Sequence, residues 1–331
     1  MSKKEKHIPF FIIGMQRSGT TLLRLILNNH SKIAVPEEST FLMPFLRKKY
    51  LIKPIKGEKL ITFAKYLKGN AQFKAWDYDY RSFLDYLSRH NELMLKDIIA
   101  RMFESYCQSE SKQFWADKTP SFFRKVYYLH KMFPEAKIIH ILRDGRDVFN
   151  SWRKIDPSKN NEVAVALEWV YKNKEIEKST RRYNVDRLAV RYEDLISNPE
   201  KIIKDICDFV QVEYEPQMLQ FYNKSRDYIG THHSSLIFGK IDSSNCYKWE
   251  RELTDKEKIA FEVIAKNYLK KYRYDSCYLP LRLKDYIQGF MSLIKAVPRR
   301  IRQVFYTKYI FCRAAAKGKA VERKYFGNAN E

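Results

Sequence analysis

The stretch PFFIIGMQRSGTT, residues 9–21, constrains the fold of this chain more than any other. A short apolar run ends at Gly14, a glycine-spaced loop follows, and residues 21–30 have the length of a helix. A strand, a glycine loop and a helix in this order bind anions through backbone N–H groups at the helix N-terminus. A Walker A loop would carry lysine where this chain has Thr20, so the loop predicts an anion site of another kind.

The other residues of the loop also suit an anionic ligand. Gly14 and Gly19 allow the backbone to approach the ligand closely, and Arg17 brings positive charge in place of the lysine. Hydroxyl donors come from Ser18, Thr20 and Thr21. Nothing in the loop is obviously built around Mg²⁺. Ordinary glycine turns show the same spacing, so the loop alone leaves both interpretations open.

A second motif follows the apolar run KIIHIL, residues 137–142. Arg143 stands at the end of this expected strand, and Ser151 comes eight residues later within the next expected helix. Ligands of α/β proteins bind at the carboxyl ends of parallel strands, so the two side chains can converge on one phosphate. The alternative is a charge cluster at the helix start, in which the acidic and basic residues of RDGRD (143–147) pair with one another.

Strand and helix patterns alternate along the rest of the core. Strands are expected within 32–40 and at 187–190, and helices at 162–182 and from 198 to about 210. DKTPS (117–121) and RYEDL (191–195) are interpreted as turns. The alternation predicts an α/β fold: a P-loop-like, mostly parallel β-sheet flanked by helices.

Two segments depart from this alternation. Residues 45–112, rich in Tyr, Phe, Lys and Asp, predict a helical insertion. Residues 285–331 carry ten Lys or Arg and three acidic residues between apolar clusters, which predicts a basic helical C-terminus. We therefore divide the chain into a domain, 1–284, and an amphipathic extension, 285–331. The extension either lies on an anionic membrane surface or packs on the domain with its basic face in water.

The net charge and the cysteine content indicate which classes of partner and which cellular compartment to expect. The chain has 62 Lys and Arg against 39 Asp and Glu, and a net charge of +23 predicts anionic partners. Its five cysteines include no C-x-x-C pair and no metal-ligand spacing, which argues against a zinc site and favours a reducing, cytoplasmic location. No run of about 18 apolar residues occurs, so no membrane-spanning segment is expected.

Together, the two motifs resemble the sulfotransferase family, which uses 3′-phosphoadenosine 5′-phosphosulfate (PAPS). The resemblance rests on PFFIIGMQRSGTTLLRLILNNH, IIHILRDGRDVFNSW, LAVRYEDLISNPEKIIKDICDFV and YKWERELTDKEKIAFEVIAKNYLKKYRYD. These segments span the core from about residue 8 to 275, apart from the insertion. The resemblance implies an enzyme that transfers a sulfuryl group from PAPS to a hydroxyl without a metal.

The resemblance also implies which residues bind the donor. The 5′-phosphosulfate loop corresponds to Arg17, Ser18, Gly19, Thr20 and Thr21, and the 3′-phosphate pair to Arg143 and Ser151. Tyr192 corresponds to an aromatic residue near the adenine, and Lys248 to a basic residue that reaches the cofactor from a late loop. Ser243 and Ser244 lie close to Lys248 in sequence and are candidates for further hydroxyl contacts.

The expected catalytic residues are Glu38, Lys118 and Arg17. The sequence resembles the protein-tyrosine and glycan branches of the family, in which a glutamate is the base, and the spacing favours Glu38 over Glu37. By resemblance, Lys118 reaches the bridging oxygen between sulfate and phosphate, where negative charge develops. Two plainer interpretations remain: an exposed acidic turn after Pro36, and a helix start at DKTP.

The acceptor is not identified by the sequence. A composition rich in Lys, Asn, Ile and Tyr hints at an AT-rich bacterial genome, which favours a glycan or glycolipid over a peptide tyrosine. No nucleic-acid partner is expected. The rival hypotheses are a P-loop kinase or NTPase and a non-catalytic nucleotide- or membrane-binding protein. Of the remaining features, His140 is interpreted as a core histidine, His232 and His233 as a solvated pair, and WDYDY (76–80) as either acceptor cleft or packing.

Overall fold

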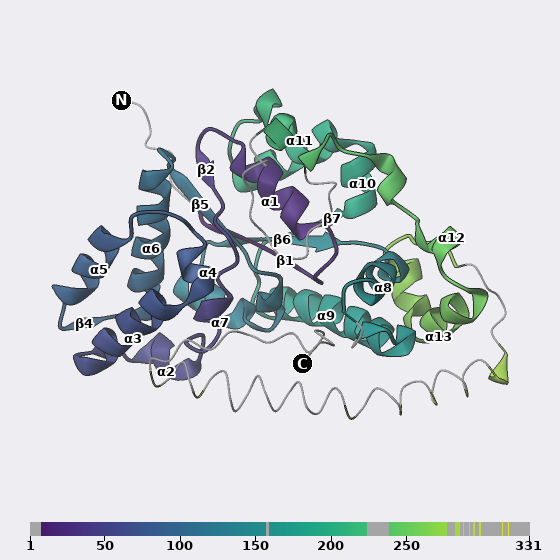
Figure 1. Cartoon of the computed structure of the whole chain (residues 1–331), viewed down its shortest axis with the longest axis horizontal. Coiled ribbons are helices and arrows are strands. Elements are labelled where there is room, and N and C mark those ends of the chain that lie inside the picture. Colours follow the sequence, from purple (N-terminus) through teal and green to yellow (C-terminus); the bar gives the residue numbers. More distant parts are fainter. Residues whose placement is uncertain are drawn as a thin grey trace.

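A five-stranded parallel sheet organises the molecule (Figure 1). The computed structural model describes residues 8–156, 159–223 and 238–276, with 282–284 and single positions from there to 317. The strands, in their order across the sheet, are β2 (Ile33–Ala34), β5 (Phe114–Lys118), β1 (Phe10–Gly14), β6 (Lys137–Leu142) and β7 (Arg187–Arg191). Each neighbouring pair is parallel, which confirms the predicted α/β class.

Central strand β1 shows why these residues form a buried strand. Its five residues, FFIIG, are all buried. A parallel strand with helices on both faces reads as one apolar run, as this one does. Phe10 and Ile12 belong to one hydrophobic cluster, whereas Phe11 and Ile13 belong to another. The strand therefore contributes alternate side chains to a core on each face of the sheet.

Helices cover both faces of the sheet. The helices α1 (Thr20–Asn28), α10 (Tyr192–Ser197) and α11 (Pro199–Val210) share one hydrophobic cluster on one face. The other face is covered by α6 (Leu95–Ser109), α7 (Val126–Met132) and α9 (Glu162–Arg182) (Figure 1). A third cluster, around Trp169, joins α9 to α8 (Gly145–Arg153), α12 (Trp249–Glu252) and α13 (Asp255–Lys271).

Helices also make up most of the 45–112 segment. Besides α6 they are α2 (Lys48–Ile52), α3 (Glu58–Gly69), α4 (Ala71–Lys74) and α5 (Arg81–Ser88). A short antiparallel pair that the sequence did not predict, β3 (Ile55–Lys56) with β4 (Glu92–Leu93), ties the segment together. Trp76 of WDYDY is buried among Phe73, Phe103 and Tyr106, so this ring packs the segment.

The turn prediction for DKTPS is wrong at its first two residues, and that for RYEDL is wrong throughout, because Arg191 ends β7 and the next four residues begin α10. Asp117 and Lys118 are the last residues of β5, and the turn begins only at Thr119, before the 3-10 helix η2 (Pro120–Arg124). The sequence pattern did not predict this strand, because its polar end is buried against other polar groups. RYEDL leaves β7 directly into α10, whose first turn carries Glu193 and Asp194, acidic residues that favour a helix N-terminus.

His140 is a core histidine, as predicted. It is completely buried, one ring nitrogen contacts Asn173 Oδ1 at 3.0 Å, and the other contacts Arg187 at 3.2 Å. Burial lowers the pKa of His140 to about 4, so the ring is neutral at pH 7. His232 and His233, and most of 285–331, lie outside the described residues. Within the described part of the chain, no helix is long and apolar enough to cross a bilayer.

Candidate functional site

The loop between β1 and α1 has a backbone that requires glycine at position 19. Gly19 has φ 88°, a left-handed conformation, and it precedes the first turn of α1. A Cβ atom at Gly19 would lie 2.3 Å from the ring of Tyr192. The Tyr192 ring therefore packs directly against the loop, which brings a residue from the start of α10 to the predicted anion site.

The N-terminus of α1 is suited to an anion. Among the described residues, no side chain caps this helix end, and its first turn carries no acidic residue. The first N–H groups of a helix have no partner within the helix, and the helix dipole adds partial positive charge there. Ser18 and Thr20 are buried beside them. The arrangement is that of an anion-binding helix terminus.

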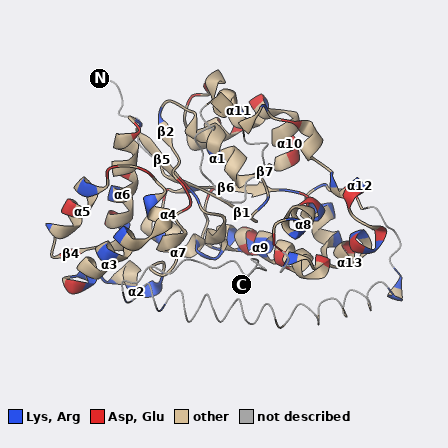
Figure 2. Cartoon of the chain, in the orientation of Figure 1, with Lys and Arg blue, Asp and Glu red and all other residues tan. Residues whose placement is uncertain are grey.

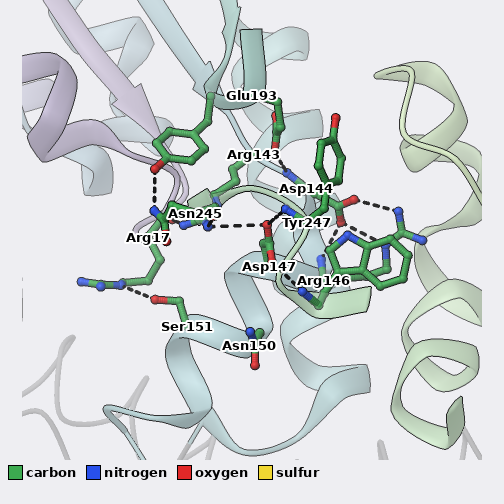
Figure 3. Close-up of polar contacts among 12 residues, drawn as sticks. Arg17, Arg143, Asp144, Arg146, Asp147, Asn150, Ser151, Glu193, Asn245 and Tyr247 are labelled. Atoms are coloured by element: carbon green, nitrogen blue, oxygen red, sulfur yellow. Dashed lines mark hydrogen bonds and ion pairs between the residues drawn. The ribbon is translucent and has the colours of Figure 1, made fainter. Parts of the chain in front are cut away.

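Arg17 connects the two predicted anion motifs. It also has positive φ, 72°, and its Nε donates a hydrogen bond to Ser151 Oγ at 2.9 Å (Figure 3). Arg143 Nη1 in turn donates to the backbone oxygen of Arg17 at 3.2 Å. Residues more than 120 positions apart in the sequence thus meet at one place.

Arg143 lies largely buried at the end of β6. Its Nη2 donates to the backbone oxygen of Asn245 at 2.7 Å, and its guanidinium lies 4.5 Å from the centre of the Tyr192 ring. Within the described part of the chain, its Nε has no hydrogen-bond partner although it is buried. Burial, and next the charge of Arg143, lower the pKa of Arg17. Two neighbouring cations withdrawn from water favour a bound anion.

The alternative interpretation of RDGRD, a structural charge cluster, is also visible. Asp144 and Arg146 form a buried ion pair at 2.7 Å, and Arg146 reaches Glu262 of α13 at 2.5 Å. Asp147 lies 3.5 Å from Arg143 and accepts N–H bonds from the late segment 247–249 (Figure 3). The motif therefore anchors α13 and this late segment as well as presenting Arg143.

The two candidate glutamates face different partners. Glu38 Oε1 lies 2.8 Å from Lys118 Nζ; the Lys118 side chain is 1% exposed, whereas that of Glu38 is 30% exposed. Glu37 instead pairs with Arg24 of α1 at 2.7 Å. Arg24 also donates to the backbone oxygens of Val35 and Pro36, which fixes the loop after β2. The geometry thus joins Glu38 to Lys118 and Glu37 to Arg24.

In the late segment, the described contacts involve a residue that the sequence did not predict. Asn245 donates to the Tyr192 hydroxyl at 2.6 Å, and its carbonyl accepts from Arg143. Lys248 is half-buried at the start of α12, and Ser243 and Ser244 are exposed at a 3-10 turn capped by Asp242. Lys248, the residue predicted from the sequence, lies three positions later, and Asn245 makes the contacts with Arg143 and Tyr192. The only sequence signal for it was its position three residues before Lys248.

Comparisons with known proteins identify similar sequences and a similar fold. An uncharacterised protein of Aquifex aeolicus is 26% identical over 73% of this chain, and protein-tyrosine sulfotransferase 1 of Danio rerio is 26% identical over 73%. The matches span only 30% and 60% of those two relatives. The sulfotransferase domain of the Synechococcus PCC 7002 olefin synthase superposes with a TM-score of 0.56 at 22% identity, covering 83% of this chain and 98% of that domain.

The family comparison decides the assignment. The sulfotransferase family model matches residues 9–216, from the first strand to beyond α11 and more than half of the chain. This range includes the anion loop, Lys118, Arg143, Ser151 and Tyr192. The chain belongs to the sulfotransferase family.

Proposed function

We propose that the protein transfers a sulfuryl group from PAPS to an acceptor hydroxyl. The observation that carries the proposal is that Arg17, Arg143 and Ser151 meet beside the N-terminus of α1. This contact brings the two predicted anion motifs next to each other, as binding the two phosphate-bearing ends of one nucleotide requires. In the reaction, the bond between sulfur and the bridging oxygen breaks, and a bond from sulfur to the acceptor oxygen forms. The acceptor proton leaves, and 3′-phosphoadenosine 5′-phosphate (PAP) is released.

Each part of the donor has candidate residues. The loop residues Arg17 to Thr21 would bind the 5′-phosphosulfate through backbone N–H groups, hydroxyls and one guanidinium. Arg143 and Ser151 would bind the 3′-phosphate. Tyr192, which packs on Gly19 and under Arg143, would contact the adenine, with Asn245 and Lys248 closing the site from the late segment.

The ion pair of Glu38 and Lys118 supplies the proposed chemistry. Glu38 is the partly exposed member, so its carboxylate can accept the proton of an acceptor hydroxyl arriving from solvent. Lys118 and Arg17 would stabilise the negative charge that develops on the bridging oxygen, an interaction stronger in the transition state than before it. The transferred sulfuryl group carries less negative charge than a phosphoryl group, so we propose that the reaction needs no metal.

The acceptor is proposed to be a glycan or glycolipid, with a peptide tyrosine as the alternative. The genome-composition argument favours the first, whereas relatives named protein-tyrosine sulfotransferases favour the second. Transfer of ³⁵S-sulfate from PAPS should be measured with saccharides, glycolipids and tyrosine peptides, with ATP as a rival donor. Phosphate transfer from ATP without sulfate transfer from PAPS would favour the kinase hypothesis and refute ours.

We also propose a cytoplasmic location with peripheral contact between residues 285–331 and an anionic membrane. The supporting observation is a row of exposed apolar side chains in helical conformation, Ile287, Met291 and Ile294, which continues from Leu283 at the end of the domain with spacings of four, four and three. An apolar helix face with flanking lysines and arginines suits the interface of an anionic bilayer. Flotation of the full chain with phosphatidylglycerol vesicles, repeated in high salt, tests the contact; absence of flotation at low salt would refute it.

A further inference from the structure

A buried polar cluster lies directly behind the Glu38–Lys118 pair. The Ser39 hydroxyl donates to Asp117 Oδ2, and the Ser39 backbone N–H donates to Thr119 Oγ1 at 2.8 Å. Ser39, Asp117 and Thr119 are all completely buried. Ser39 follows Glu38 in the chain, and Asp117 and Thr119 flank Lys118 on either side. These two contacts thus join the loop after β2 to the end of β5.

We propose that Ser39, Asp117 and Thr119 are positioning residues, which we call the clasp, that hold Glu38 against Lys118 for sulfuryl transfer. The inference rests on the proposed function, because it assumes that this ion pair contains the base. None of the three catalytic candidates, Glu38, Lys118 and Arg17, and none of the proposed donor-binding residues belongs to the clasp.

The need for a clasp follows from where the two partners lie. Lys118 is on a strand that is fixed by pairing with β1, where Lys118 is aligned with Ile12. Glu38 lies between β2 and the 3-10 helix η1 (Thr40–Leu42), where the backbone has no repeating hydrogen bonds of its own. A long carboxylate side chain on such a loop samples many positions unless its neighbours are fixed.

Other contacts tether the same loop, but to different parts of the molecule. On the N-terminal side, Arg24 of α1 binds the backbone at Val35 and Pro36. On the C-terminal side, the Tyr66 hydroxyl donates to the backbone oxygen of Phe41 at 3.0 Å. The clasp contacts, in contrast, join the residue next to Glu38 to the residues next to Lys118.

The clasp is costly for stability, which argues against a purely structural role. A completely buried carboxyl group loses its hydration, and within the described part of the chain Asp117 Oδ1 has no hydrogen-bond partner. Burial raises the pKa of Asp117 to about 7, opposed by the hydrogen bonds from Ser39 and Thr119; the charged groups facing it are Glu38 and Lys118. Apolar residues at these positions would pack without that cost.

Exact placement matters for the rate. Displacement of a catalytic group by about 1 Å can cost roughly 100-fold in rate, whereas donor binding by the separate loop and Arg143 would not change. A weakened clasp should therefore lower kcat and leave the KM for PAPS and the affinity for PAP almost unchanged. A general loss of structure would instead lower all three together.

The test uses the full chain and four variants, with steady-state sulfate transfer, calorimetric binding of PAP and a thermal melt. Ser39→Ala removes the hydroxyl that binds Asp117. Thr119→Val removes the hydroxyl that binds the Ser39 N–H at nearly constant shape, and Thr119→Ser restores it. Ser105→Ala is the matched control, because Ser105 is buried on α6 and its hydroxyl has no hydrogen-bond partner among the described residues.

We expect Ser39→Ala and Thr119→Val to lower kcat at least tenfold with PAP affinity within twofold of wild type, and Thr119→Ser and Ser105→Ala to keep kcat. If Ser39→Ala melts below the assay temperature, the two Thr119 variants decide. If Thr119→Val keeps the wild-type kcat, or if kcat and PAP affinity fall in parallel, the clasp inference is refuted, while the proposed function is not affected. A wild-type protein that transfers no sulfate from PAPS to any acceptor overturns the proposed function and this inference with it.

Discussion

The two-site interpretation of donor binding makes its sharpest prediction at Arg143. Arg143→Ala should weaken PAP binding, because it removes a cation that the 3′-phosphate would contact. A hydrogen bond to a charged group contributes about 1.5–3 kcal/mol, which corresponds to roughly 10- to 150-fold in Kd. Arg143 already donates to the Asn245 carbonyl and lies 3.5 Å from Asp147, so phosphate would partly exchange existing interactions. We therefore expect the lower end, on the order of 10- to 30-fold.

The assay compares two nucleotides by calorimetry in EDTA. PAP carries the 3′-phosphate and adenosine 5′-phosphate lacks it, so wild-type protein should bind PAP more tightly. Arg143→Ala should remove most of that difference. The control is Arg153→Ala, which removes the last arginine of the following helix, α8, where it pairs with Glu257 at 2.8 Å. This variant should keep the difference in affinity between the two nucleotides. If Arg143→Ala weakens both nucleotides equally, Arg143 does not bind the 3′-phosphate.

Three further predictions test neighbouring residues. Glu38→Gln should lower kcat about 100-fold or more and keep PAP affinity, whereas Glu37→Gln should keep kcat; the reverse result would identify Glu37 as the base. Gly19→Ala should abolish PAP binding in calorimetry, because a Cβ would collide with the Tyr192 ring at 2.3 Å. Because the pKa of Asp117 rises to about 7 on folding, its burial destabilises the protein increasingly from pH 4 to 7; urea unfolding of Asp117→Asn should show a gain over wild type that grows across this range.

Sequence patterns predicted the central elements because their signals are local. The apolar run before Gly14 and the helix at 162–182 each combine a continuous pattern with clear ends, and both occur as expected. The strand 114–118 was missed because its final residues are polar. The buried Asp117 carboxylate near its end accepts a hydrogen bond from Ser39, 78 residues earlier, a contact that no local pattern could indicate.

The late segment shows a different limit. A motif match identified Lys248, but this segment contacts Arg143 through the backbone oxygen of Asn245, which a motif match does not indicate. Tyr247 has φ 56°, and Asp147 binds the N–H groups of residues 247 and 249. These features turn the chain so that Asn245 contacts Arg143 and Tyr192. Such a turn depends on a helix about 100 residues away and cannot be derived from the segment itself.

A net charge of +23 does not by itself create an anion site, because exposed lysines are screened by water and salt. The decisive feature is which groups the acidic side chains near Arg143 bind. The Asp144 carboxylate accepts three hydrogen bonds from Arg146. Asp147 accepts two backbone N–H bonds from the late segment and stays 3.5 Å from Arg143, while burial raises its pKa. The acids of RDGRD thus serve as anchors and neutralise Arg143 only in part. The structural cluster and the proposed anion site are therefore the same arrangement.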